Sequence, residues 1–258
     1  MSVSETRREA TLDAAVLDAV IFDLDGVLTD TATVHMKAWK ETFDAFLEEV
    51  EGQGYRPFDA ADYRRYVDGK PRYDGVESFL ASRDIELPRG DPDDEPGRHT
   101  VYGLGNGKNE RFRTVLERDG VEPFESSVAF VEACRHLGLK TAVVSSSKNC
   151  RAVLETAGIE DLFEARVDGV VAARLDLPGK PAPAIFLEAA RRLDVGPASA
   201  AVLEDAVAGV QAGRAGSFRV VIGVDRTGHP DALRNAGADL VVGDLGELEL
   251  TSPEGSGE

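Results

Sequence analysis

The stretch AVIFDLDGVLTD, residues 19–30, decides the expected fold because an apolar run ends there in charge. Apolar residues lead directly into Asp23, and Asp25 follows after one residue and stands before a glycine. An apolar run closed by a turn signal is typical of a strand that is buried on both faces. Carboxylates at the end of a buried strand cost free energy unless a partner compensates their charge. The stretch therefore predicts a central strand with a functional site at its carboxyl end.

Similar apolar runs follow along the chain and alternate with helical patterns. Helical spacing is found at Val128–Leu137, at Cys150–Ala157 and from Pro183 to Leu193, with Gly or Pro marking the ends. Strands that alternate with helices predict an α/β fold, a doubly wound parallel sheet with helices on both faces. The expected strands are Val16–Phe22, Lys140–Ser145, Ala200–Leu203, Arg219–Val224 and Asp239–Val242.

The alternation fails between about residues 32 and 119, where apolar side chains recur at helical spacing. We therefore expect a helical domain, 32–119, inserted into a core domain formed by 12–31 and 120–250. Within the insert, the stretch 87–107 is rich in Pro, Gly and Asp, which predicts a long irregular loop. The tails, 1–11 and 251–258, are expected to be flexible.

Composition limits the classes of partner. The chain has 258 residues, is 42% hydrophobic and carries a formal net charge of -18. Such a surface repels nucleic acid and anionic membranes, so we expect neither as a partner. The N-terminal residues lack an apolar signal core, and Cys134 and Cys150 fall on apolar helix faces as free thiols. We expect a monomer in the cytoplasm.

Polar residues gather where the predicted strands end. Because parallel strands present their carboxyl ends at one edge of a sheet, these side chains should lie close together. Converging carboxylates repel and raise one another's pKa, which a divalent cation relieves. Oxygen ligands without His or Cys favour Mg²⁺, and Mg²⁺ beside a lysine and a hydroxyl is typical of a phosphate site. The residues are Asp23, Asp25, Ser145, Lys180, Glu204 and Asp205.

Four motifs in this order resemble those of the haloacid dehalogenase superfamily: DLDGVLTD, the serine of VVSSSKN, the lysine of GKPAP and the acidic pair of LEDAVAG. The resemblance implies that Asp23 is a nucleophile that forms a phosphoaspartate and that Asp25 is the general acid and base. It also implies that Ser145 and Lys180 hold the phosphoryl oxygens. The implied Mg²⁺ ligands are Asp23, Asp25 through its carbonyl, Glu204 and Asp205.

Each of these residues also has a purely structural interpretation. Asp23 and Asp25 could form a turn at a strand end, and Ser145 could cap a helix. Lys180 could be a solvated surface lysine. Either acidic residue of LEDAVAG could cap the helix that follows it.

The start of the insert, TDTATVHMKAWK, resembles the beta-phosphoglucomutase branch of the superfamily. That resemblance implies a helical cap that closes over the site, with Asp30 and Thr31 as its hinge. His35 and Trp39 are four residues apart and share a helix face. By the resemblance His35 lies over Asp25 in the closed state. His35 could instead be a partly buried histidine of the cap, and Trp39, with Phe43 and Phe46, fits the core of the cap first.

Further stretches match the same branch. DGKPRYDGV implies that Arg72 binds the distal phosphate of a sugar phosphate, and GKNERF implies that Lys108 and Asn109 face the sugar. SSSKN implies that Ser146 and Lys148 lie near the phosphate. The alternatives are a surface arginine, surface lysines and a Lys-Asn pair at a helix start. The stretch 87–107 has no counterpart in a compact cap of this branch.

Two enzymatic functions therefore remain, both with Mg²⁺ as cofactor and a small sugar phosphate as substrate. One is a phosphosugar mutase that interconverts β-glucose 1-phosphate and glucose 6-phosphate through a phosphoaspartate and a bisphosphate. The alternative is a phosphatase of small sugar phosphates, in which water receives the phosphoryl group. A Mg²⁺-dependent binding module with an inactive site is a third, non-enzymatic reading. The core motifs suit both enzymes, and the features of the insert favour the mutase.

Overall fold

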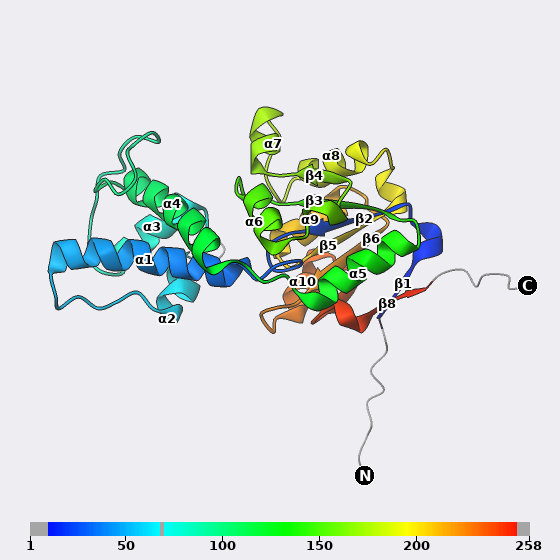
Figure 1. Cartoon of the computed structure of the whole chain (residues 1–258), viewed down its shortest axis with the longest axis horizontal. Helices are drawn as coiled ribbons and strands as arrows, with labels where there is room; N and C mark the ends of the chain where they lie inside the picture. The colour runs from blue at the N-terminus through cyan, green and yellow to red at the C-terminus, as the bar shows by residue number, and fades with distance from the viewer. Residues whose placement is uncertain (1–9, 68–69, 252–258) are drawn as a thin grey trace, which may run out of the picture. The chain divides into compact units, whose positions relative to one another are not determined.

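The computed structural model describes residues 10–67 and 70–251 (Figure 1). The chain divides into two compact units. One consists of the residues up to Asp30 together with those from Glu122 onward, and it contains every strand of the described chain. The other is the continuous segment Thr31–Val121, which is helical.

A six-stranded parallel sheet forms the first unit, in the order β4-β3-β2-β5-β6-β7. The central strand β2 (Ala19–Asp23) lies between β3 (Lys140–Val144) and β5 (Ala200–Glu204) and is buried along its whole length. The outer strands are β4 (Ala165–Val167), β6 (Val220–Val224) and β7 (Leu240–Val242). All the expected strands are present. β2 begins later than expected, because Ala14–Val16 form a short 3-10 turn.

Three short strands escaped the sequence analysis. They are β4 and a separate parallel pair formed by β1 (Ala10–Asp13) and β8 (Leu248–Thr251). Ala10, Thr11 and Thr251 therefore belong to strands rather than to the expected flexible tails, whose remaining residues lie outside the described ones.

Helices cover both faces of the large sheet. Successive residues of β2 point to opposite faces, so Ile21 and Phe22 contact different helices. Ile21 packs into the cluster that contains Phe186 of α8. Phe22 meets Phe130 of α5 edge-on, with ring centroids 6.3 Å apart. The doubly wound α/β fold is thus confirmed. The helices of this unit are α5 (Glu125–His136), α6 (Cys150–Ala157), α7 (Gly169–Arg174), α8 (Ala184–Arg192), α9 (Val207–Ala215) and α10 (Pro230–Ala236).

The helical unit is built around aromatic side chains. Phe43 of α1 packs against the rings of Trp39, Phe58 and Phe79, with centroids 5.0, 5.2 and 4.1 Å away. Its elements are α1 (Thr31–Glu51), α2 (Ala60–Asp62) with a π-helical turn (Tyr63–Val67), α3 (Arg72–Ala81) and α4 (Val101–Asp119). Burial of these rings supplies the apolar area that stabilises the unit.

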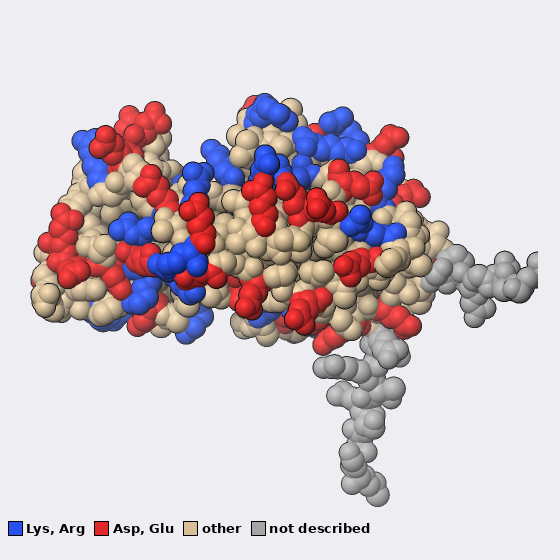
Figure 2. Space-filling view, in the orientation of Figure 1, with Lys and Arg blue, Asp and Glu red and all other residues tan. Residues whose placement is uncertain are grey.

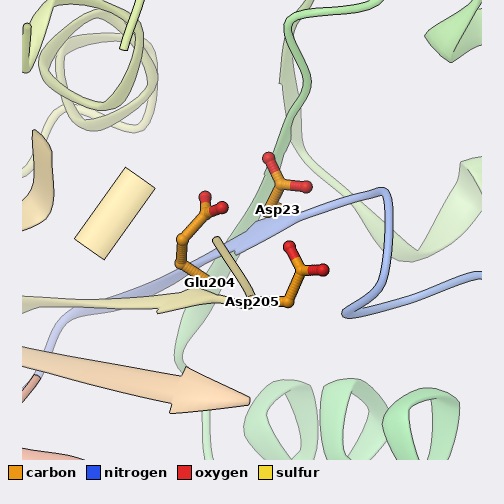
Figure 3. Close-up of side chains that lie close together, drawn as sticks. All are labelled: Asp23, Glu204 and Asp205. Atoms are coloured by element: carbon orange, nitrogen blue, oxygen red, sulfur yellow. The ribbon is translucent and has the colours of Figure 1, made fainter. Parts of the chain in front are cut away.

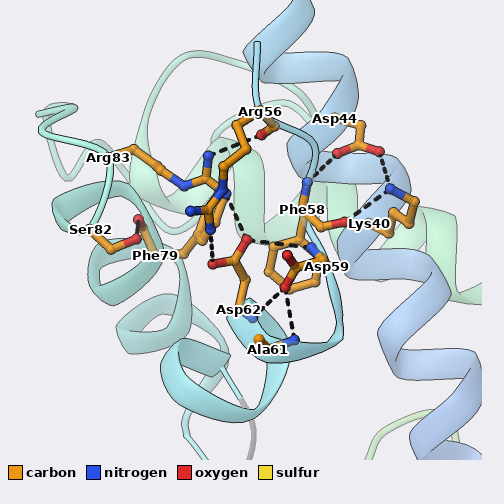
Figure 4. A network of polar contacts seen from close by, with 10 residues as sticks. All are labelled: Lys40, Asp44, Arg56, Phe58, Asp59, Ala61, Asp62, Phe79, Ser82 and Arg83. Carbon is orange, nitrogen blue, oxygen red and sulfur yellow. Dashed lines mark hydrogen bonds and ion pairs between the residues drawn. The ribbon is translucent and has the colours of Figure 1, made fainter.

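A buried carboxylate ties three segments of this unit together (Figure 4). Asp62 is only 3% exposed, and its oxygens accept from Arg56 at 2.7 Å and from Arg83 at 2.6 Å. Asp59 caps α2 by accepting from the backbone N–H groups of Ala61 and Asp62. The stretch before α2, the helix itself and the end of α3 therefore meet at one charged group.

The segment 87–107 is helical from Val101 onward, so the expectation of one long irregular loop is wrong for its last third. Thr100 caps α4 by accepting from the backbone N–H of the third residue after it. The glycines of this first stretch have low helix propensity, which is why the sequence favoured a loop. Packing outweighs propensity here: a Cβ on Gly105 would lie 2.6 Å from a ring carbon of Tyr73.

Acidic and basic side chains are interspersed on the face shown in Figure 2, in keeping with acidic residues spread along the whole chain. Both cysteines are free and buried, and burial raises the pKa of the Cys134 thiol to about 12. Among the described residues, none of the helices combines the length and apolar character required to cross a lipid bilayer.

Candidate active site

The turn after β2 sets the direction of two carboxylates. The backbone N–H of Asp25 donates to Asp23 Oδ2 at 2.9 Å, and that of Leu24 donates to the carbonyl of Val144 at 3.0 Å. Gly26 then turns the chain with a φ of +80°, which favours glycine. Pairing with β3 thus continues past Asp23 before the turn begins, and this holds Asp23 at the carboxyl end of the sheet.

Lys180 joins Asp23 to β5. Its Nζ donates to Asp23 Oδ1 at 2.5 Å and to Glu204 Oε2 at 2.7 Å. The lysine side chain is 11% exposed, so it is not a solvated surface residue. Burial disfavours its ammonium, but the charges of the two carboxylates outweigh burial and raise the pKa of Lys180. The site therefore contains a fixed positive charge beside Asp23.

Three carboxylates come together at the ends of β2 and β5 (Figure 3). Asp23, Glu204 and Asp205 each offer an oxygen within 4.8 Å of the others. Burial, and then the charge of Glu204, raises the pKa of Asp23 well above its usual value. Burial, and then the charge of Asp23, raises the pKa of Asp205 to about 7. One lysine cannot balance this group, whose oxygen-only donor set suits a hard divalent cation.

Ser145 holds Asp25. Its hydroxyl donates to Asp25 Oδ2 at 2.8 Å and accepts from the backbone N–H of Ser147 at 3.0 Å. Ser145 is fully buried, and α6 begins several residues later, so the serine does not act as a helix cap. Ser146 and Lys148 follow as exposed residues. Neither side chain contributes to the two hydrogen bonds described for the Ser145 hydroxyl.

Arg226 is a site residue that the sequence analysis missed. Its Nε donates to the carbonyl of Gly26 at 2.9 Å, and its guanidinium lies 3.9 Å from the ring centroid of Phe124. A second nitrogen donates to Asp244 at 2.9 Å. Arg226 thereby braces the turn that carries Asp25. It lies two residues after the end of β6, so the same strand-end argument that found the acids could have found it.

In the helical unit, Lys108 contacts two other predicted residues. Its Nζ lies 2.6 Å from His35 Nδ1 and 5.1 Å from the ring centroid of Trp39. Lys108 is 5% exposed, so the interpretation as a surface lysine is wrong. An ammonium can only donate, so Nδ1 accepts and the ring proton lies on Nε2. Burial, and then the charges of Lys108 and Arg72, lowers the pKa of His35 well below its usual value.

Arg72 reaches the same part of the unit. Its guanidinium donates to Asn109 Oδ1 at 3.1 Å, and it forms no ion pair with the described acidic residues. Lys108 and Asn109 lie in the interior of α4 rather than at its start, which corrects the alternative of a helix-start pair. The predicted residues of the insert thus form two sets of contacts. Lys108 contacts His35 and Trp39, and Arg72 contacts Asn109, the neighbour of Lys108 in α4.

Comparison with known proteins identifies the class. Residues 17–216 match the family described as haloacid dehalogenase-like hydrolase. The chain therefore belongs to this family of enzymes, and its relatives place it in the beta-phosphoglucomutase-like branch. A protein from Mycobacterium bovis named beta-phosphoglucomutase is 54% identical over 237 residues, which cover 89% of this chain and 90% of that protein.

Solved structures agree with this assignment. A haloacid dehalogenase family hydrolase from Deinococcus radiodurans, with bound phosphate and sodium, gives a TM-score of 0.68 at 28% identity and covers 90% of this chain and 93% of its own. The beta-phosphoglucomutase of Clostridium difficile gives 0.65 at 26% identity and covers 90% and 92%. The fold therefore extends over nearly the whole of each protein.

Proposed function

We propose that this enzyme is a phosphosugar mutase that interconverts β-glucose 1-phosphate and glucose 6-phosphate. The observation that carries the proposal is that each of the two units holds a basic side chain suited to binding a phosphate. The sheet unit has Lys180 bonded to Asp23 beside an acidic group. The helical unit has Arg72, which forms no ion pair with the described acidic residues. A mutase handles a substrate that carries two phosphates midway through its cycle, so it needs both. The name of the 54% identical relative supports the same activity.

In the proposed reaction a carboxylate oxygen of Asp23 attacks phosphorus, and the bond from phosphorus to the sugar oxygen breaks. Asp25 gives a proton to the departing oxygen when Asp23 is phosphorylated and takes a proton from the attacking hydroxyl in the reverse sense. The hydrogen bond from Ser145 orients the carboxyl group of Asp25 for this task. Lys180 neutralises charge on the phosphoryl oxygens throughout.

A complete cycle uses the phosphorylated enzyme. Phosphorylated Asp23 gives its phosphoryl group to the free hydroxyl of a sugar monophosphate, which forms a bisphosphate and restores the carboxylate. The bisphosphate then turns around and returns its other phosphoryl group to Asp23. The product is the isomeric monophosphate, and the phosphorylated enzyme is regenerated without loss of phosphate.

Mg²⁺ is the proposed cofactor. Asp23, Glu204, Asp205 and the backbone carbonyl of Asp25 would hold it, since hard oxygen donors without His or Cys select this ion. When bound, the ion neutralises charge on the transferring phosphoryl group. Burial first, and then repulsion among the carboxylates, raises the pKa values of Asp23 and Asp205, and a bound divalent cation would stabilise their charged forms.

Residues of the helical unit would bind the rest of the substrate. The planar fork of Arg72 suits the phosphate that is not being transferred. Lys108, Asn109, His35 and Trp39 would face the sugar, with the neutral His35 ring offering its Nε2 proton as a donor. In the sheet unit, the exposed Ser146 and Lys148 would add contacts to the phosphoryl group.

A phosphatase of small sugar phosphates is the second candidate, favoured by the hydrolase description of the matched family. It would use the same phosphoaspartate, with water in place of the sugar hydroxyl. Only the fate of the phosphoryl group separates the two enzymes.

Phosphorus NMR of the purified enzyme with Mg²⁺, β-glucose 1-phosphate and a priming bisphosphate tests the proposal. Glucose 6-phosphate should accumulate. Free glucose with inorganic phosphate would establish the phosphatase instead. Asp23→Asn should abolish either reaction, and Arg72→Ala should impair the mutase far more than hydrolysis of a simple phosphate ester.

A further inference from the structure

The chain between α3 and α4 is an ordered segment that folds back onto the first turns of α4. The backbone N–H of Val101 donates to the carbonyl of Pro88 at 3.1 Å, and that of Tyr102 donates to the carbonyl of Arg89 at 3.1 Å. The backbone N–H of Gly97 donates to the carbonyl of Gly103 at 2.9 Å. The segment 87–100 is therefore fixed to α4 at both of its ends.

Asp94 holds the interior of this segment. It is 7% exposed, and its carboxylate accepts from the hydroxyl of Thr100 at 2.7 Å, from the backbone N–H of Asp91 at 3.0 Å and from Arg98 at 2.6 Å. Hydrogen bonds to the charged form, first from Thr100 and then from Asp91, lower the pKa of Asp94. A buried carboxylate with this many donors specifies one conformation of the surrounding chain.

Asn106 links the segment to α3. Its amide nitrogen donates to the carbonyl of Pro92 at 3.1 Å and to the carbonyl of Asp94 at 2.9 Å. Its amide oxygen accepts from the hydroxyl of Tyr73 at 3.0 Å. Both N–H groups and the oxygen are thus used, so the side chain of Asn106 has one orientation. Through it, the segment fixes the position of the Tyr73 ring.

Tyr73 stands directly beside Arg72. The Tyr73 ring lies against Gly105, where a Cβ would be 2.6 Å from it, and meets the ring of Tyr102 at a centroid distance of 4.5 Å. The guanidinium of Arg72 lies 5.7 Å from the centroid of the Tyr73 ring and donates to Asn109. The absence of a side chain at Gly105 therefore lets the Tyr73 ring approach α4, while the Arg72 side chain would be only in ordinary contact with a Cβ there.

We propose that the segment 87–100, acting through Asn106 and Tyr73, is a positioning element that orients Arg72 toward the phosphate that is not transferred. The inference rests on the proposed function, since it takes Arg72 as the ligand of that phosphate. A planar fork binds a phosphate with two parallel hydrogen bonds only when its plane is correctly turned. An arginine that is held in this orientation beforehand loses less conformational freedom when the substrate binds.

Two variants test the contacts of Asn106 with the segment and with Tyr73 separately. Asn106→Asp keeps an oxygen for Tyr73 but removes both N–H groups that bind the segment. Tyr73→Phe keeps the ring and removes only the hydroxyl. Each should raise KM for β-glucose 1-phosphate roughly five- to tenfold and leave kcat within about twofold, because substrate binding is weakened while Asp23 and Asp25 are untouched. Tyr66→Phe, the same change elsewhere in the unit, is the matched control and should leave KM unchanged.

A double-mutant cycle shows whether the effect passes through Arg72. In an Arg72→Ala background, Asn106→Asp should add no further loss, because the group that it orients is gone. Hydrolysis of p-nitrophenyl phosphate, which carries no second phosphate, should be the same in Asn106→Asp and Tyr73→Phe as in the wild type. Thermal melting followed by circular dichroism checks that each variant is folded.

The outcomes are distinct. If the wild type is a mutase and neither variant raises KM, segment 87–100 does not position Arg72 and the inference is overturned. Losses that add fully in the Arg72→Ala background overturn it as well, because the variants then act by another route. A wild-type enzyme that yields only glucose and inorganic phosphate defeats the proposed function, and the inference falls with its premise.

Discussion

At the turn after β2, Gly26 adopts a φ of +80° and leaves no room for a side chain, because a Cβ there would overlap the carboxyl group of Asp205. Gly228 has a φ of +78° but has no atom within 4 Å of the corresponding position. The two glycines therefore share a backbone requirement and differ in their surroundings.

This pair gives a matched experiment. Gly228→Ala should lower the free energy of unfolding by about 1–2 kcal/mol, the cost of a left-handed conformation for alanine. Gly26→Ala should cost about 1–3 kcal/mol more, because Asp205 must also move, and phosphoryl transfer should be lost. Urea denaturation of both variants measures the difference. Equal losses would show that the Asp205 carboxyl group shifts freely.

His35 should be neutral near pH 7. Its pKa is lowered by burial and then by the charges of Lys108 and Arg72. As pH falls below about 6.5, the unfolded chain binds a proton that folded His35 still excludes. His35 therefore makes the free energy of unfolding decrease in that range, down to its own lowered pKa. Nitrogen NMR of the imidazole should show the Nε2–H tautomer at pH 7, and Lys108→Met should raise the pKa of His35. A charged ring at pH 7 would contradict the contact.

Single residues were predictable where topology brings them together. Asp23, Ser145 and Glu204 lie at the ends of parallel strands, and one rule about strand ends is enough to place them side by side. The contact of Lys108 with His35 joins positions 73 residues apart, and that of Arg226 with Gly26 joins positions 200 apart. The family resemblance named Lys108 and His35 separately, and no local pattern predicted that either pair would be in contact.

α2 is held to its neighbours by a charged group, the carboxylate of Asp62. Asp62 is 3% exposed and binds Arg83, which is 10% exposed, and Arg56, which is 66% exposed. Asp62→Ala should destabilise the protein by about 3–5 kcal/mol, because a buried arginine loses its partner. Arg56→Ala should cost far less than Asp62→Ala, because solvent screens an exposed pair. Denaturant unfolding compares them, and similar losses would show that Asp62 contributes through Arg56 alone.

Helices and strands were predictable when their own periodicity decided them. β2, β3 and α8 follow directly from apolar patterns, and Gly158 ends α6 in the left-handed conformation that its sequence position suggests. The start of α4 was not predictable in this way. Its glycines favour a loop, and only the structure shows that the Tyr73 ring packs against Gly105. Helix propensity describes a single helix, so it cannot predict a glycine whose role is to let two helices approach closely.

For the whole molecule, the net charge of -18 and the acidic group at the sheet edge make stability sensitive to cations. Mg²⁺ that binds only the folded state should raise the melting temperature, with a stabilisation of about 2.7 kcal/mol when its concentration is 100 times its Kd. EDTA should reverse the shift, and Asp205→Asn should reduce it. Sodium chloride at equal ionic strength is the control, because it screens surface charge without filling the site. An equal shift with sodium chloride would argue against a Mg²⁺ site.

The central strand of the large sheet is made long before its partners. On the ribosome, residues 24–139 must be added after β2 before β3 begins, and Glu204 must be added before β5 is complete. The helical unit, Thr31–Val121, is continuous and can fold in that interval. The nascent chain thus carries an unpaired apolar strand, ending in the proposed nucleophile, while residues 24–139 are added. That strand is the segment of the growing chain where we expect a chaperone to bind.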